Sequence, residues 1–175
     1  KSHEVNGDVY QHLSSAVFDG KISRDLCKLI TLCVLYGQSS KNIEKKIPSG
    51  MSSQLVIRKT REFFNVSYLE RILQQSLKKK NLRNILGRPI NLSLDDSRLS
   101  LNYFLQSSAA EISVLLFSEW CRENEKNVLP IYVIHDALIV DCNESLSKKL
   151  LDDKIIDLSI GDWSLKAKVT QVSNI

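Results

Sequence analysis

Several features that mark other classes of protein are missing from this chain of 175 residues. It contains no run of about 18 apolar residues, so the sequence predicts no membrane span. Nothing near Lys1 resembles a signal peptide. Internal repeats, low-complexity segments and an obvious linker are also missing. What remains is typical of a globular protein long enough to bury a real core. Because the chain begins with Lys1 rather than Met, we expect a processed or excised piece.

Cysteine is scarce, and its spacing does not indicate a metal site. The four cysteines form no Cys-x-x-Cys pair and no zinc-type spacing, and all lie in apolar segments. We therefore expect reduced core cysteines and a reducing, intracellular compartment, which is the cytoplasm or nucleoid, or a host cell or organelle for a viral or organellar source. The chain has no large excess of one charge, since it contains 24 Lys and Arg residues and 20 Asp and Glu residues. The net charge of +4 permits a nucleic-acid partner without requiring one.

Hydrophobic periodicity predicts a chain that is mainly helical before it turns to strands. Asp8 and Ser23 are candidate N-caps, and a break is expected near Asn65. The expected helices cover residues 8–18, 23–37, part of 40–50, 52–80, 95–124 and 145–158. The expected turns and strands are a short hairpin around residues 87–89, a hairpin over residues 131–141 and a final strand over residues 163–172. The helix over residues 95–124 has apolar residues on more than one face, so we expect it to be largely buried.

The stretch IYVIHDALIVDC, residues 131–142, places a histidine and an aspartate between two apolar runs. Both runs are expected to be buried strands joined by a tight antiparallel turn. A carboxylate held against apolar strands costs several kcal/mol unless it is paired, hydrogen-bonded or bound to a metal. Asp136 is therefore either a turn aspartate that bonds its own backbone or a metal ligand at the tip of the hairpin.

The helix over residues 23–37 carries two cations on one ridge. Arg24, Lys28 and Leu32 follow at i, i+4 and i+8, and Tyr36 continues the row. The opposite positions are apolar and are expected to pack inward: Leu26, Ile30, Cys33 and Val34. Neither cation has an acidic residue at i±4 on its own face, so the two repel each other unless an anion lies over them. Either they point into water, or they bind a polyphosphate.

Five segments, in order, resemble motifs of the family A DNA polymerases, the DNA polymerase I-like enzymes of bacteria, phages and mitochondria. RDLCK followed by LYG (24–37) is similar to motif B, and VIHDALIVD (133–141) is similar to motif C. GDVYQHLSSAVF (7–18) resembles the helix before motif B. ILGRPI (85–90) resembles the Gly-Arg hairpin, and LNYFLQSSAAEI (101–112) the helix with Asn, Gln and a run of small residues. Order and approximate spacing agree over nearly the whole chain.

The resemblance implies a role for each matching residue of motif B. Arg24 and Lys28 would contact the triphosphate of the incoming nucleotide, and Lys28 would also protonate the leaving pyrophosphate. Leu32 stands where the family usually has an aromatic ring that packs against that nucleotide. Tyr36 would pack at the templating position, and Gly37 would let the template base come close.

The other motifs imply contacts with DNA and metal. Asn102 and Gln106 would reach the minor groove of the primer–template, and Arg88 of the Gly-Arg hairpin would bind DNA. His135 would contact the primer terminus. Asp136 would hold catalytic Mg²⁺ in a two-metal site.

Three departures from the family pattern are present. Leu32 replaces the aromatic ring, and Ala137 stands where motif C usually has a glutamate. Motif A, the strand whose aspartate bridges both metals, is missing, and so is the thumb. Asp95 and Asp96 follow the Gly-Arg hairpin and are better explained as a helix N-cap and first turn. Asp141 is five residues from Asp136, and strand alternation over an odd separation does not favour a place at the same metal.

The resemblance implies an α+β protein: a helical fingers region over residues 1–82, then the C-terminal part of a palm over residues 83–175, with a partial antiparallel sheet backed by the long helix. The implied function is two-metal addition of deoxynucleotides to a primer 3′ end, as a DNA-directed DNA polymerase. The implied partners are primer–template DNA, deoxynucleoside triphosphates and a further chain or segment that carries motif A and the thumb. Without that segment, the piece is expected to expose sheet edge and apolar surface.

Two other interpretations remain open. The chain could be a degenerate polymerase module that binds DNA or a protein without catalysis, for which Leu32 and Ala137 would be signs of decay. It could also be part of a single-subunit RNA polymerase, whose motif B and single-aspartate motif C are similar. The LQSSAAEI segment and the Gly-Arg hairpin favour the DNA enzymes.

Overall fold

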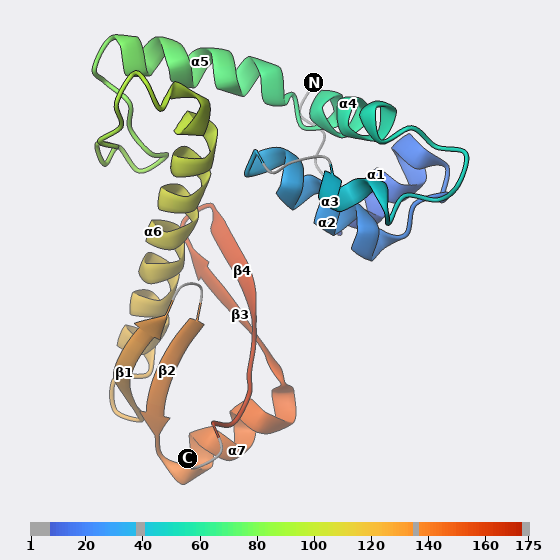
Figure 1. Cartoon of the computed structure of the whole chain (residues 1–175). Helices are drawn as coiled ribbons and strands as arrows, with labels where there is room; N and C mark the ends of the chain where they lie inside the picture. The colour runs from blue at the N-terminus through green and yellow to red at the C-terminus, as the bar shows by residue number, and fades with distance from the viewer. Residues whose placement is uncertain (1–7, 38–40, 135–136, 173–175) are drawn as a thin grey trace. The chain divides into compact units, whose positions relative to one another are not determined.

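The computed structural model describes residues 8–37, 41–134 and 137–172, and its elements are labelled in Figure 1. Helices and short antiparallel strands occur together, which confirms the α+β class. The chain forms two compact units, Lys1–Leu105 and Gln106–Ile175. The division into fingers and palm at residue 82 concerns function and stays a prediction. No helix within the described residues is long and apolar enough to cross a lipid bilayer.

The first unit is helical, as predicted. Its helices are α1 (Val9–Phe18), α2 (Arg24–Leu35), α3 (Lys41–Glu44), α4 (Ser53–Phe63) and α5 (Val66–Lys78). Asp8 caps α1 and Ser23 caps α2, each through a side-chain oxygen that accepts backbone N–H groups of the first turn. Asn65 takes a left-handed conformation, φ 51°, and separates α4 from α5 at the predicted break.

Burial of one face of α2 forms the centre of the first unit's core. Ile30, Cys33 and Val34 on the predicted inward face are buried. They belong to one apolar cluster with Leu13 and Phe18 of α1. α2 also packs on α4, so it is enclosed from two sides. The inward face predicted for this helix is therefore confirmed.

The long helix begins later than predicted and is less buried. A short 3₁₀ turn, η1 (Ser97–Leu99), precedes α6 (Ser100–Glu123). Leu101, Leu116 and Phe117 are buried, whereas Tyr103, Val114 and Leu115 are 39–45% exposed. The prediction of a largely buried helix is thus wrong for this chain, because its own elements cover only part of the apolar circumference.

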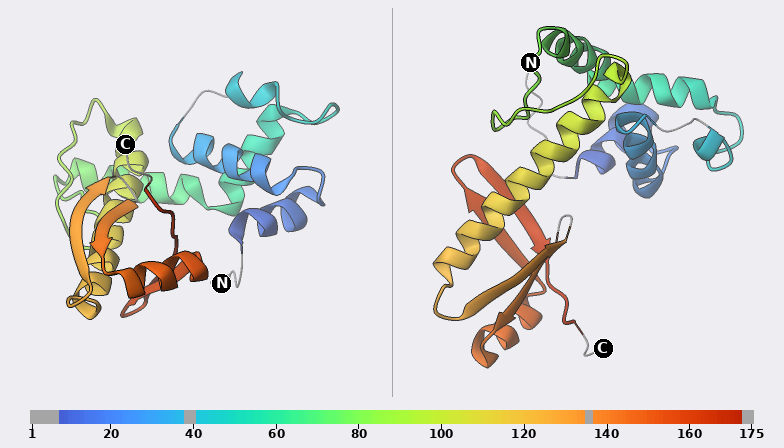
Figure 2. Two further views of the ribbon diagram at one scale, coloured as in Figure 1. Left: turned by 90° about the horizontal axis from the view of Figure 1, so that it is seen from below. Right: turned by 60° about the vertical axis from the view of Figure 1, so that its left-hand side comes forward.

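The second unit contains two separate antiparallel hairpins that both lie along the later part of α6 (Figures 1 and 2). β1 (Val128–Ile134) pairs with β2 (Ala137–Cys142), and β3 (Ile155–Ile160) pairs with β4 (Trp163–Lys168). No ladder joins the two hairpins within the described residues, so the expected single sheet is divided into two. Leu116 and Phe117 of α6 form a small core with side chains from both hairpins.

Two expectations for this unit need correction. The outer strand β1 is not buried, since Leu129, Ile131 and Tyr132 are 57–62% exposed. The exposed apolar surface itself was predicted. The helix expected over residues 145–158 ends early: α7 covers Glu144–Asp153, and Lys154 turns left-handed at φ 59°. Residues after Lys154 then pair with β4, because the β-branched pair at 155–156 favours a strand.

Replacing a buried leucine should lower the stability of the protein much more than replacing an exposed one. Leu13 is fully buried and Leu129 is 60% exposed. We expect Leu13→Ala to lower the free energy of unfolding by about 2–5 kcal/mol because it leaves a cavity. Leu129→Ala, the matched control, should change it by about 0.5 kcal/mol or less. Denaturant unfolding followed by circular dichroism measures both free energies of unfolding; equal losses would contradict the burial of Leu13 in the core.

Candidate functional site

The helix α2 presents the predicted ridge to its outer side. Lys28 is exposed, and Arg24, Leu32 and Tyr36 are partly buried. The backbone N–H of Tyr36 donates to the carbonyl oxygen of Leu32 at 2.9 Å and ends the helix. Gly37 follows with φ +66°, a left-handed conformation that other residues adopt only with strain. Five predicted site residues therefore lie on one helix and its C-terminal turn.

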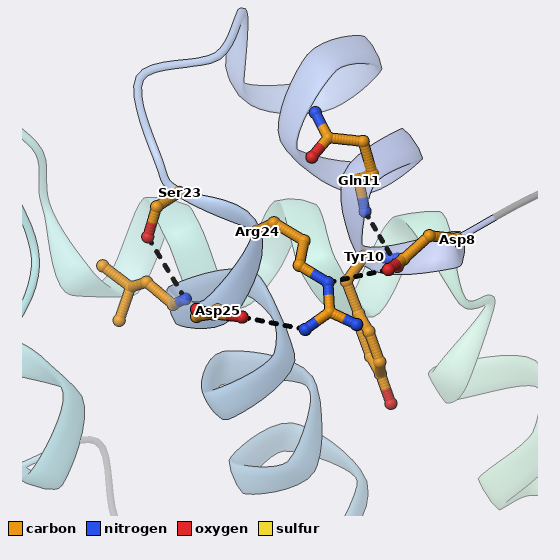
Figure 3. A network of polar contacts seen from close by, with 7 residues as sticks. Asp8, Tyr10, Gln11, Ser23, Arg24 and Asp25 are labelled. Carbon is orange, nitrogen blue, oxygen red and sulfur yellow. Dashed lines mark hydrogen bonds and ion pairs between the residues drawn. The ribbon is translucent and has the colours of Figure 1, made fainter. Parts of the chain in front are cut away.

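Arg24 is bound by side chains from two helices (Figure 3). Its Nε donates to Oδ2 of Asp8 at 2.7 Å, and its Nη1 donates to Oδ1 of Asp25 at 2.8 Å. The guanidinium carbon lies 5.6 Å from the centroid of the Tyr10 ring, within the range of a cation–π contact. Neither sequence alternative described this state, in which the cation is paired within the chain.

These contacts change the proton affinities of the groups involved. The hydrogen bond from Arg24 lowers the pKa of Asp8, and the backbone N–H groups of Gln11 and Tyr10 lower it further against the effect of desolvation. Hydrogen bonds to Asp25 and then to Asp8 raise the pKa of Arg24. Asp25 contributes most to that shift, yet its side chain is 88% exposed, whereas that of Asp8 is 40% exposed. Because solvent screens exposed pairs, the Asp8 contact is the firmer of the two.

The Gly-Arg segment forms a tight turn held by a buried asparagine. Asn84 is 5% exposed, and its Oδ1 accepts the backbone N–H groups of Leu86 at 3.1 Å and Arg88 at 2.9 Å. Gly87 takes φ +86°, and its N–H donates to the carbonyl oxygen of Asn84 at 3.0 Å. The predicted hairpin is thereby reduced to a turn with a single bridge, Arg83 to Pro89. Sequence reasoning did not identify the role of Asn84.

The two amide residues predicted to reach DNA lie one turn apart on α6. Gln106 is exposed, as a contact with an external ligand requires. Asn102 is partly buried, and its Oδ1 is buried without a hydrogen-bond partner among the described residues. A buried, unpaired amide oxygen costs about 1–3 kcal/mol. Where the two side chains lie relative to DNA stays a prediction.

The motif C prediction falls mainly outside the described residues, since His135 and Asp136 are not among them. The closing pair of the hairpin is Ile134 with Ala137. Asp141 pairs with Leu129 near the other end of β2, four residues from Ala137, or about 13 Å along an extended strand. This separation places Asp141 far from the Ile134–Ala137 pair. Within the described residues, no group of three carboxylate, histidine or cysteine side chains could hold a metal ion, so they do not fit a two-metal site by themselves.

The second unit also contains a cleft of about 940 Å³. Its walls come from α6, the whole of β2, α7 and the β3–β4 hairpin with the residues that follow it. Apolar side chains dominate the α6 wall, among them Phe117 and Trp120. The edge of β2 that does not face β1 has no partner strand within the described residues. The cleft therefore combines apolar surface with the unpaired edge of a strand.

Comparison with known proteins adds one finding. No family model and no curated protein sequence matches the chain. Among solved structures, it is similar to the POL domain of Pol1 from M. smegmatis, determined in complex with a DNA primer-template and dNTP. The TM-score is 0.59 at 20% sequence identity, and the match covers 82% of this chain. The chain has a polymerase-like fold. It spans 29% of the similar chain, so this polymerase-like fold corresponds to part of that domain.

The carboxylate that binds Arg24 should make stability depend on pH. A lowered pKa means that Asp8 stabilises the folded chain above the ordinary aspartate range, and that this contribution is lost as pH falls through its folded pKa. We expect Asp8→Asn, which keeps an N-cap oxygen, to lower Tm at about pH 7, and the difference in Tm from the wild type to shrink as the pH falls below the ordinary aspartate range. Thermal unfolding of both proteins across this pH range measures the difference in Tm. A difference in Tm that stays constant as the pH falls would contradict the role of the ion pair.

Proposed function

We propose that this chain is the C-terminal fingers and palm portion of a template-directed DNA polymerase that adds deoxynucleotides to a primer 3′ end. The observation that carries the proposal is the polymerase-like fold together with α2, on which Arg24 and Lys28 lie one turn apart. The similar structure was determined with a DNA primer-template and dNTP, which supports the same two classes of ligand here.

In this proposal, the ridge of α2 binds the incoming nucleotide. Arg24 and Lys28 contact the triphosphate and neutralise the charge that develops on it, while Lys28 protonates the pyrophosphate as it leaves. Leu32 packs against the nucleotide in a softer contact than an aromatic ring would make. Tyr36 and Gly37 adjoin the template base. The support comes from their common helix and from the exposure of Lys28.

The proposed contacts with primer and template come from three places. Gln106 and Asn102 on α6 reach the minor groove, Arg88 in the Asn84-held turn binds the DNA backbone, and His135 meets the primer terminus. The turn supports the role of Arg88, because Oδ1 of Asn84 accepts the backbone N–H groups of Leu86 and Arg88 and so holds the backbone at Arg88 in one conformation. Binding of a polyanion to such cations should weaken with salt.

The metal site of the proposal needs a carboxylate from a segment outside this chain. Mg²⁺ would be held by Asp136 together with an aspartate of motif A, and it would supply Lewis-acid chemistry at the transferred phosphate. We do not assign Asp141 this role, because it pairs with Leu129 at the end of the hairpin far from the Ile134–Ala137 pair.

The surface of the second unit supports a partner segment. β1 exposes apolar side chains on both of its faces, and β2 has an unpaired edge beside an apolar cleft. Water-exposed apolar strands of this kind are a liability in a soluble protein unless another segment covers them. A strand that adds to the β2 edge and brings the motif A aspartate would cover the cleft and complete the site in one step.

Loss of the proposed metal ligand should abolish synthesis. In a complete polymerase that contains this chain and the motif A segment, we expect Asp136→Ala to remove primer extension because the metal loses a direct ligand. Asp141→Ala on the same hairpin is the matched control and should retain extension. Near-normal extension by the Asp136 variant would refute the metal role.

Primer extension also separates the other interpretations. We expect this chain alone to show no synthesis, and the complete enzyme to incorporate deoxyribonucleotides in preference to ribonucleotides. A preference for ribonucleotides would favour the RNA polymerase interpretation. Failure of every motif A segment to restore synthesis, with DNA binding that survives loss of both Arg24 and Lys28, would favour a degenerate module.

A further inference from the structure

The guanidinium of Arg24 is anchored between the first turns of two helices (Figure 3). Asp8 precedes α1, whereas Arg24 and Asp25 begin α2. Tyr10 of α1 adds its ring beside the same guanidinium. An arginine side chain has many rotamers when it is free, and contacts from two elements select among them.

Asp8 divides its two carboxylate oxygens between two tasks. Oδ1 accepts the backbone N–H groups of Tyr10 at 2.9 Å and Gln11 at 3.2 Å, which caps α1. Oδ2 accepts the Nε–H of Arg24 at 2.7 Å. Because the cap fixes Oδ1, the position of Oδ2 is also fixed, and Arg24 meets an acceptor that does not move with α2.

Asp25 is a weaker anchor for the same guanidinium. It is the next residue after Arg24 on α2, and its side chain is 88% exposed. Its carboxylate therefore moves with the helix that carries Arg24 and has no comparable fixed contact within the described residues. Within the part of the chain that the structure describes, the hydrogen bonds to Asp8 and Asp25 use Nε and Nη1, so the two N–H donors of Nη2 are left for an external acceptor.

We propose that Asp8 is a positioning residue for triphosphate binding: it holds Arg24 so that the Nη2 end of the guanidinium is presented to the phosphates beside Lys28. This inference rests on the proposed function of α2. It assigns to the residue that caps α1 a second role, which is exerted through Arg24 rather than by contact with the nucleotide.

Charge alone makes the opposite prediction, which gives the proposal a clear test. Asp8 and Asp25 together cancel the charge of Arg24 and Lys28. If the two carboxylates acted only as negative charges near a polyanion, removing either would strengthen nucleotide binding by similar amounts. If Asp8 positions Arg24, removing the carboxylate of Asp8 weakens nucleotide binding, and removing that of Asp25 weakens it much less.

The experiment measures the dissociation constant of dTTP for the full chain by calorimetry in magnesium buffer. Asp8→Asn keeps an oxygen for the N-cap and loses the carboxylate toward Arg24, so folding is retained. Asp25→Asn is the matched control. Arg24→Gln and the double variant that combines Asp8→Asn with Arg24→Gln complete a double-mutant cycle. We expect Asp8→Asn to weaken dTTP binding about three- to tenfold, as the cost of ordering one long side chain implies, and Asp25→Asn by less than about twofold.

The double variant distinguishes positioning from a general structural effect. We expect Asp8→Asn to add nothing once Arg24 is Gln, because the group that it positions is gone. A further loss in that background, or tighter binding by Asp8→Asn, would overturn the positioning role while nucleotide binding through Arg24 stands. Unchanged dTTP affinity in Arg24→Gln, or no binding by the wild-type chain, would overturn the nucleotide site and the role of Asp8 together.

Discussion

The arrangement of the first unit depends on burial of one face of α2. Ile30, Cys33 and Val34 are enclosed by α1 and α4, and with about 3.6 residues per turn this leaves the row of Arg24 and Lys28 on the other side. The same packing brings the beginning of α1 to the beginning of α2. An apolar interaction thus decides which charged groups meet, and the ion pairs form where packing has already placed them.

The second unit has a small core and exposes many apolar side chains. Its core is a small cluster around Leu116, Phe117 and Leu158, and both of its sheets have only two strands. Two-stranded hairpins are marginal in water unless they pack on something else. Here α6 packs on one side of the hairpins, while β1 exposes apolar side chains to solvent on both of its faces. This exposed apolar surface is the physical reason for proposing that a further segment packs on the chain.

Local signals predicted much of the fold. The N-caps at Asp8 and Ser23 and the break at Asn65 depend on a few neighbouring residues, so they could be recognised without tertiary structure. Burial of the strand at 131–134 and of the helix at 95–124 was predicted wrongly, because apolar composition states what can be buried and not what covers it. The strand at 155–160 was missed because its isoleucines also continued a helical pattern, which the left-handed Lys154 ends.

For the candidate site, the sequence by itself determined which residues share a helix face: the spacing of Arg24, Lys28, Leu32 and Tyr36 follows from helical geometry alone. It also contains, in order, the segments that resemble family A motifs, and the comparison supports the polymerase-like fold of the chain. Only the tertiary structure decided that Arg24 is paired with Asp8, 16 residues away, and that Asn84 organises the turn before Arg88. The physical reason is that periodicity is a local property, whereas a hydrogen bond between two helices exists only after packing has brought their ends together.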